Sequence, residues 1–203
     1  LQNRTEEGCN HALRPSMSTD SASNPEAIVN ALDDKAQRLL TPCGDGHMVW
    51  RRWGSGPRTV VLFHGGHGAW SHWIRNIPVL AERYTVIAAD APGCGDSASP
   101  PEPYDGDSLA DIVAGGLQQI IPADAPPYHL VGFSFGGVLS VPTAFRLNGR
   151  LASLTLVGAG GLDLARRFPL GPMKGWRKLT DAAEIMAAHR HNLGTIMISD
   201  PAR

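Results

Sequence analysis

The sequence predicts an α/β fold, in which a mostly parallel sheet is covered by helices on both faces. Short apolar, β-branched runs such as 59–63 and 84–90 alternate along the chain with longer segments whose apolar residues recur at helical spacing. Glycine clusters follow the apolar runs at 64–68, 93–95 and 132–137, where turns between elements belong. With 203 residues, we expect one compact domain.

The first third of the chain predicts a polar lead, one helix and two strands. Residues 1–24 are polar and are expected to be a disordered extension, within which Met17 is a candidate native start. Apolar residues at helical spacing predict a short amphipathic helix over 25–40. Alternation over 47–56 is typical of an outer strand, and the apolar run 59–63 predicts a central strand that is buried on both faces.

The remaining elements repeat the alternation of strand and helix. An apolar stripe predicts a helix over 69–84, and Pro78 inside it predicts a kink or a shorter helix. Ligands of parallel sheets bind at the carboxyl ends of the strands, so a site is expected at the glycine-rich turns. The elements expected after this helix are strand 84–90, helix 108–121, strand 128–133, helix 134–148 and strand 151–159.

Composition narrows the classes of function. A formal net charge of −1 gives no electrostatic basis for binding nucleic acid or an anionic membrane, so a small-molecule partner is expected. The three cysteines include no CxxC pair, which argues against a disulfide scaffold or a structural zinc site and favours a reducing cytoplasm. The sequence has no apolar run of about eighteen residues that would predict a membrane span. No pattern points to a cofactor, and the oligomeric state stays open.

The segment Gly132-Phe133-Ser134-Phe135-Gly136 matches the nucleophile elbow. A serine at the tip of so tight a turn needs strained dihedrals, at about 1–3 kcal/mol, and glycines two residues away on either side. The predicted strand before it and helix after it are the setting that the motif requires. The start of that helix would let the Phe135 amide donate to a developing oxyanion. The alternative is that these residues form only a flexible turn.

The cluster 64–68, His-Gly-Gly-His-Gly, follows the predicted central strand directly. Its backbone can approach a ligand closely, and the Gly66 amide is expected to be a second oxyanion donor. The two histidines also raise the alternative of a metal site. Glycines leave no rigid element to hold both imidazoles, however, and no third ligand cluster is evident, so no metal is expected and His64 is expected to brace the loop. The substrate pocket is expected to include His64, Gly65, His67 and Phe133.

Three motifs occur in order, HGGHG after one strand, DAPGCGDS after the next and GFSFGG after a third. With this arrangement, residues 45–160 resemble the α/β-hydrolase fold superfamily of the serine hydrolase type. The resemblance implies Ser134 as the nucleophile and Gly66 and Phe135 as the oxyanion donors. It also implies a lid inserted after strand 151–159.

The resemblance divides the chain into the extension 1–24, a core over 25–162 and the start of a helical lid over 163–203. The family's catalytic acid and histidine follow the serine, and we expect both to be missing, with this chain a truncated member. The complete protein is then expected to be active and the 203-residue chain nearly inert. The apolar edge 154–157 would be left open, so poor solubility or partial unfolding is expected.

Three residues after Ser134 are candidates for the rest of a triad. Asp163 follows a predicted strand, where some members carry their acid, and is a weak candidate because it can equally mark the start of the lid. His189 and His191 lie in an apolar helical stretch. Either is a candidate base, and the alternative is that they border the pocket from the lid.

The resemblance leaves the substrate open. Hydrolysis of an ester through an acyl-enzyme on Ser134 is the first expectation, and hydrolysis of a carbon–carbon bond in a vinylogous diketone is the second. Proline-specific aminopeptidases carry a proline where His67 stands, which disfavours them. Serine in place of aspartate argues against dehalogenases and epoxide hydrolases. A member that binds ligands without turnover is the alternative from another class.

Overall fold

The computed structural model describes residues 24–160, 174–175 and 179–197, and for His189 and 192–197 it describes the backbone alone. The expected disordered extension therefore lies almost wholly outside the described residues, as does much of the expected lid over 163–203. Among the described residues, no helix has the length and apolar character needed to cross a membrane.

Helix α1 (Pro25–Asp33) belongs to a separate unit from the sheet and is described by itself. Asn24 caps it, because the side-chain oxygen accepts the Glu26 N–H at 3.1 Å. Pro25 occupies the first turn, where a missing N–H is harmless. The helix expected over 25–40 is wrong in its second half, since the chain leaves the helix after Asp33.

Six strands form one sheet in the order β1-β2-β4-β3-β5-β6. Strand β2 runs antiparallel to both neighbours and every other neighbouring pair is parallel, which confirms the expected mostly parallel sheet. Strand β3 lies between β4 and β5, as expected of the central strand. The strands are β1 (Gln37–Cys43), β2 (Gly46–Trp53), β3 (Thr59–Phe63), β4 (Thr85–Ala89), β5 (Tyr128–Phe133) and β6 (Leu151–Val157).

Strand β1 corrects two expectations. It pairs with β2 along its whole length, from Gln37 opposite Arg52 to Cys43 opposite Gly46. This pairing outweighs the helical spacing that predicted a helix through residue 40. It also means that the strand expected over 47–56 is not an outer strand, because β1 covers its outer edge.

The helix expected over 69–84 does not form as one element. A 3₁₀-helix, η1 (Trp70–Trp73), is followed by a separate short helix, α2 (Ile77–Ala81). Pro78 stands in the first turn of α2. Because proline has no N–H for the carbonyl four residues earlier, it blocks a continuous helix and starts a new one.

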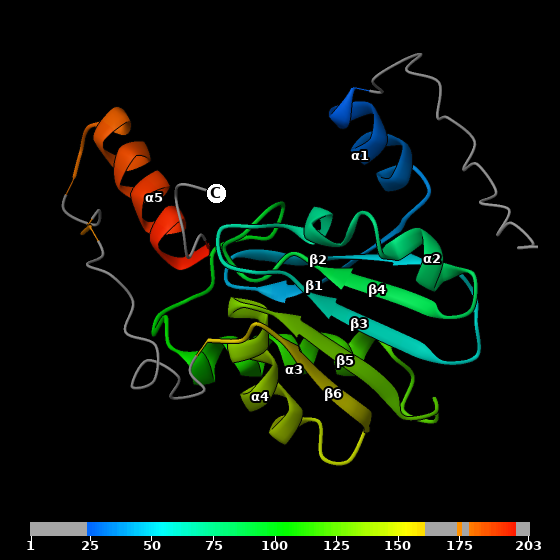
Figure 1. Ribbon diagram of the computed structural model, residues 1–203. Helices are drawn as coiled ribbons and strands as arrows, with labels where there is room; N and C mark the ends of the chain where they lie inside the picture. The colour runs from blue at the N-terminus through cyan, green and yellow to red at the C-terminus, as the bar shows by residue number, and fades with distance from the viewer. Residues whose placement is uncertain (1–23, 161–173, 176–178, 198–203) are drawn as a thin grey trace, which may run out of the picture. The chain divides into compact units, whose positions relative to one another are not determined.

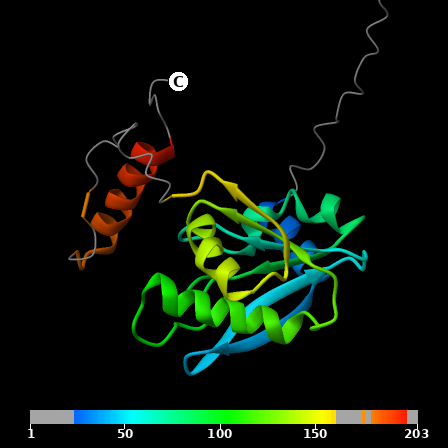
Figure 2. The same ribbon diagram turned by 90° about the horizontal axis from the view of Figure 1, so that it is seen from below.

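Helices cover both faces of the sheet, as expected. Helices α3 (Gly106–Ile120) and α4 (Phe135–Arg146) lie on one face, and η1 and α2 lie on the other (Figure 1). Seen from below, α3 and α4 stand in front of the strands (Figure 2). A capping box at Asp105 and Ser108 begins α3. Helix α5 (Ala182–Met197) confirms the helical stretch predicted around His189.

The core lies between the sheet and helices α3 and α4. Its large buried side chains include Trp50, Phe63, Leu117 and Leu130, each of which contributes about 1.5–3 kcal/mol on burial. Strand β6 differs, since it ends the described sheet and most of its residues are exposed. The core therefore holds β3, β4 and β5 firmly, while β6 is the least protected strand.

Candidate active site

Ser134 lies between β5 and α4, at the sharp turn from strand to helix. Its backbone has φ 51° and ψ −114°, a conformation that few residues other than glycine adopt and that stores about 1–3 kcal/mol of strain. Its N–H donates to the Val157 carbonyl at 2.9 Å, and its own carbonyl accepts the Gly137 N–H at 3.0 Å. The backbone is thus held from both sides. The half-buried hydroxyl has no hydrogen-bond partner in the described part of the chain.

Gly132 and Gly136 make this turn possible. A Cβ on Gly132 would lie 2.5 Å from the Gly136 carbonyl oxygen, and a Cβ on Gly136 would lie 2.5 Å from the carbonyl oxygens of Phe63 and His64. Any side chain at either position would force backbones apart. The glycines therefore allow close packing of the turn against the end of β3, in addition to allowing the turn itself.

The loop after β3 packs against this turn. A Cβ on Gly65 would lie 3.3 Å from the Ser134 Cβ, and a Cβ on Gly66 would lie 3.7 Å from the Phe135 Cβ. Among the described residues, neither the Gly66 N–H nor the Phe135 N–H donates to an acceptor. Two unpaired donors beside a serine are the arrangement that an oxyanion hole requires.

His64 lies behind this loop and not in an open pocket. Its side chain is 0% exposed, so the expectation that it lines the substrate pocket is wrong, while its contacts brace the loop as expected. The Ala91 N–H donates to Nε2 at 2.9 Å, and Nδ1 lies 2.7 Å from the Gly65 carbonyl oxygen. Burial lowers the pKa of His64, which keeps the ring neutral near neutral pH.

The other predicted pocket residues lie around the loop. Gly65 is buried, and its N–H donates to the His72 Nδ1 at 3.2 Å. His67 is exposed and has a left-handed φ of 54°. The half-buried Phe133 ring makes an edge contact with the His72 ring, with centroids 5.9 Å apart.

A buried ion pair that sequence reasoning missed supports the same loop. Arg51 Nη1 donates to Asp90 Oδ2 at 2.8 Å, with the two side chains 3% and 1% exposed. The other oxygen, Oδ1, accepts the Trp70 N–H at 2.8 Å, at the start of η1. A second arginine nitrogen reaches Asp96 Oδ2 at 2.5 Å. Charged residues at a strand centre and a strand end were the only signal, and they do not predict that the two meet.

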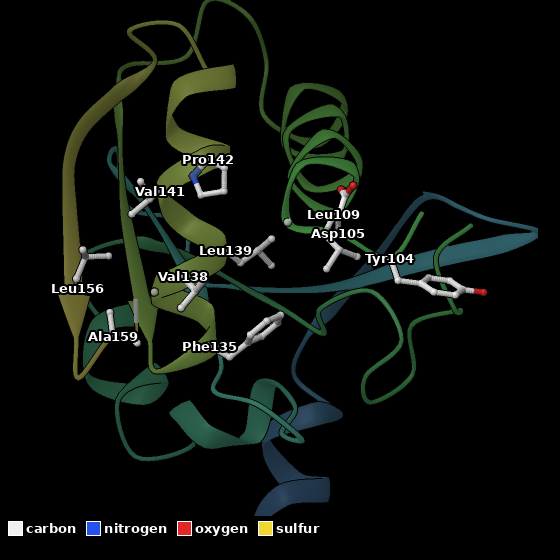
Figure 3. Close-up of a pocket in the computed structure, with 13 residues that line it drawn as sticks. Tyr104, Asp105, Leu109, Phe135, Val138, Leu139, Val141, Pro142, Leu156 and Ala159 are labelled. Carbon is white, nitrogen blue, oxygen red and sulfur yellow. The ribbon is translucent and has the colours of Figure 1, made fainter. Parts of the chain in front are cut away.

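A cavity of about 610 Å³ opens beside Phe135. It is lined mainly by apolar side chains of α4, of the start of α3 and of the end of β6. Figure 3 shows Val138 on α4 beside Leu156 and Ala159, with Tyr104 on the α3 side. Of the predicted site residues, only Phe135 lines it. Sequence reasoning could not find this cavity, because it depends on how three elements meet.

The described part of the chain places no candidate acid or base side chain at the turn that carries Ser134. Asp163 lies outside the described residues, and so does the side chain of His189. His191 is exposed on α5. Within the described part of the chain, no group of three or more histidine, cysteine, aspartate or glutamate side chains is placed to hold a metal ion.

Two curated bacterial proteins are similar to this chain. The dihydrolipoyllysine-residue acetyltransferase component of the acetoin cleaving system of Pseudomonas putida is 39% identical over 112 residues, which are 55% of this chain and 30% of that protein. A 2-hydroxy-6-oxononadienedioate/2-hydroxy-6-oxononatrienedioate hydrolase of Escherichia coli K12 is 37% identical over 131 residues, which are 62% of this chain and 44% of that protein. The chain thus spans less than half the length of these relatives.

A solved structure and a family model are also similar to this chain. A solved thermophilic esterase from Thermogutta terrifontis has a TM-score of 0.52 at 27% identity, over 61% of this chain and 46% of that chain. The family model for the alpha/beta hydrolase fold matches residues 58–189, which include the loop after β3, the turn at Ser134 and all of β6. The chain belongs to the alpha/beta hydrolase fold family.

Proposed function

We propose that this protein is a serine hydrolase that acts on a small-molecule ester, with Ser134 as the nucleophile. The observation that carries the proposal is the strained serine backbone, φ 51° and ψ −114°, beside two amides that have no acceptor among the described residues. Strain of this kind persists only where the surrounding structure imposes it, and it concentrates at active sites. A cytoplasmic location, in which the free thiols of Cys43 and Cys94 stay reduced, is part of the proposal.

In the proposed reaction, Ser134 Oγ attacks the ester carbonyl carbon while a general base takes its proton. The carbonyl electron pair moves onto oxygen, where the N–H groups of Gly66 and Phe135 donate to the developing charge. Collapse expels the alcohol, which receives the proton, and leaves an acyl group on the serine. Water then hydrolyses this acyl-enzyme by the same sequence of steps.

Hydrolysis of a carbon–carbon bond is the second candidate. The 37% identity to a 2-hydroxy-6-oxononadienedioate/2-hydroxy-6-oxononatrienedioate hydrolase favours it over other activities of the family. Both reactions would use the nucleophile and the two donor amides to polarise a carbonyl group. They differ in the leaving group, which is an alkoxide oxygen in one and a carbanion carbon in the other.

Covalent labelling tests the nucleophile directly. A fluorophosphonate probe is expected to modify Ser134, located by mass spectrometry of the tryptic peptide, and Ser134→Ala is expected to abolish the label. Absence of any label in the full-length protein would refute the serine hydrolase and favour a protein that only binds ligands. Equal labelling of the full-length protein and of the 203-residue chain would refute the expectation that the acid and base are missing from this chain.

The bond cleaved is tested with two substrates. Turnover of p-nitrophenyl acetate without turnover of a 2-hydroxy-6-oxo dienoate supports the ester. The opposite preference, measured as kcat/KM, would replace the ester by the carbon–carbon bond, because kcat/KM compares the stabilisation of the two transition states.

A further inference from the structure

The peptide unit between Gly65 and Gly66 carries one of the proposed oxyanion donors. The Gly66 N–H and the Gly65 carbonyl belong to the same planar group, and in a trans peptide they point in opposite directions. This peptide is trans, since the cis bond of the described residues is Glu102–Pro103. Any group that holds the Gly65 carbonyl in place therefore also sets the direction of the Gly66 N–H.

His64 holds that carbonyl, and its partners define the tautomer. The Ala91 N–H donates to Nε2 at 2.9 Å, so Nε2 presents a lone pair. A neutral imidazole then carries its proton on Nδ1, which donates to the Gly65 carbonyl oxygen at 2.7 Å. The ring is 0% exposed, so no water competes for either nitrogen.

The backbone that donates to the Nε2 of His64 is also held in place. Ala91 follows Asp90, whose carboxylate pairs with Arg51 and accepts the Trp70 N–H. The turn after β4 therefore presents the Ala91 N–H in a defined position. On the other side of the loop, the Gly65 N–H donates to His72 Nδ1. Both backbone groups of Gly65 are thus held by imidazoles.

We propose that His64 is a positioning residue, which aims the Gly66 N–H at the oxyanion through the bond from its Nδ1–H to the Gly65 carbonyl. This inference rests on the proposed function and extends it to a residue that does not touch the substrate. A purely structural histidine would need both of its hydrogen bonds equally. A positioning histidine needs the Nδ1 bond for catalysis and the Nε2 bond only to select the tautomer.

Two substitutions separate the bonds. The amide nitrogen of asparagine occupies the place of Nδ1, so His64→Asn keeps a donor for the Gly65 carbonyl and loses the acceptor for Ala91. The amide oxygen of glutamine reaches the place of Nε2, so His64→Gln keeps the acceptor and loses the donor. Each variant leaves one buried backbone group unpaired, and similar losses of stability are expected.

The expected result is a difference in kcat. Oxyanion hydrogen bonds strengthen in the transition state, and loss of one donor lowers kcat by about 100- to 1,000-fold. In the full-length protein, we expect His64→Gln to lose about 10- to 100-fold in kcat for p-nitrophenyl acetate with KM unchanged, and His64→Asn to lose clearly less. Equal losses in both variants, or a loss that appears in KM, would overturn the inference.

Crystal structures of both variants keep this test separate from that of the proposed function. The Gly65–Gly66 peptide is expected to rotate in His64→Gln and to keep its direction in His64→Asn. If the full-length wild type hydrolyses nothing, the proposed function fails, and the peptide directions still decide whether His64 positions the amide. An unrotated peptide in His64→Gln overturns the inference at any level of activity. If neither variant folds, nitrogen NMR of the wild type determines the tautomer of the His64 ring. An Nε2–H tautomer would refute the proposed hydrogen bond from Nδ1–H to the Gly65 carbonyl.

Discussion

Gly136→Ala is expected to destabilise the fold and to distort the site together. A Cβ at this position would lie 2.5 Å from the carbonyl oxygens of Phe63 and His64. Both oxygens belong to the backbone at the end of β3, so neither can rotate away. Real Cβ atoms essentially never approach another heavy atom within 3.0 Å, so α4 and the end of β3 must separate by at least about 0.5 Å.

The expected magnitude follows from that separation. Overpacking of this kind costs about 1–3 kcal/mol, which for a protein of this size lowers Tm by about 2–12 °C. The end of β3 leads into the loop that carries Gly66, and a misplacement near 1 Å can lower the rate about 100-fold. A fall of about 10-fold or more in kcat is therefore expected alongside the loss of stability.

Gly115→Ala is the matched control. Gly115 also lies inside a helix, α3, but a Cβ there would meet nothing within 4 Å. It is expected to stabilise the protein by about 0.5–1 kcal/mol through helix propensity alone. Urea unfolding followed by far-UV circular dichroism compares the two variants. A Gly136→Ala midpoint at or above the wild-type value would refute the packing argument.

Three further perturbations probe the strain, the buried histidine and the buried ion pair, each by urea unfolding. Ser134→Gly is expected to add about 1 kcal/mol of stability, because glycine adopts a positive φ without strain, and to abolish fluorophosphonate labelling. Ser134→Ala should lose the label without the gain in stability. A glycine variant less stable than the wild type would contradict the claim that the Ser134 backbone is strained. The free energy of unfolding is expected to fall as pH drops below 6.5, because burial lowers the pKa of His64 in the folded state and the unfolded chain then binds the proton more readily. Of the two other groups that face the ring, Asp90 raises this pKa and His72 lowers it further. His64→Asn should flatten the pH profile. A profile that keeps its slope in that variant would assign the proton to another group. Arg51→Met is expected to lower the free energy of unfolding by about 3–5 kcal/mol, because it leaves the charge of Asp90 buried without its partner. Adding Asp90→Asn should recover part of this loss. No recovery would show that the buried charge is not the cause.

The features that the sequence predicted correctly are those that neighbouring residues determine. Strands β3 and β5 are short apolar runs that each lead into a glycine-containing turn, and the turn at Ser134 is predicted by its own glycines and the two flanking elements. Pro78 affects the helix through its own backbone, so its position alone predicted that the helix over 69–84 would be kinked or shortened. What it did not indicate was how completely that helix would divide.

The features that the sequence missed depend on distant partners. Strand β1 has helical spacing, and only its register with β2 makes it a strand. Arg51 and Asp90 lie 39 residues apart, and each looks like an ordinary surface charge until the sheet places both beneath η1. His64 was expected both to brace the loop and to line the pocket. Burial decided between those roles, and burial of a polar ring cannot be read from the glycines beside it.

The turn at Ser134 joins the ends of three strands. The serine closes β5, its N–H donates to Val157 at the end of β6, and Gly136 packs against the end of β3. Since strain of about 1–3 kcal/mol at the serine is maintained by contacts from two other strands, the conformation can exist only when all three are paired. Strand β6 is an edge of the described sheet, and most of its residues are exposed. Local opening of β6 would free the Ser134 N–H and let the serine relax while the core between the sheet and α3 stays folded. The reactive geometry of the nucleophile is therefore tied to the most exposed strand of the described sheet, so any change that stabilises the pairing of β6 also supports the active site.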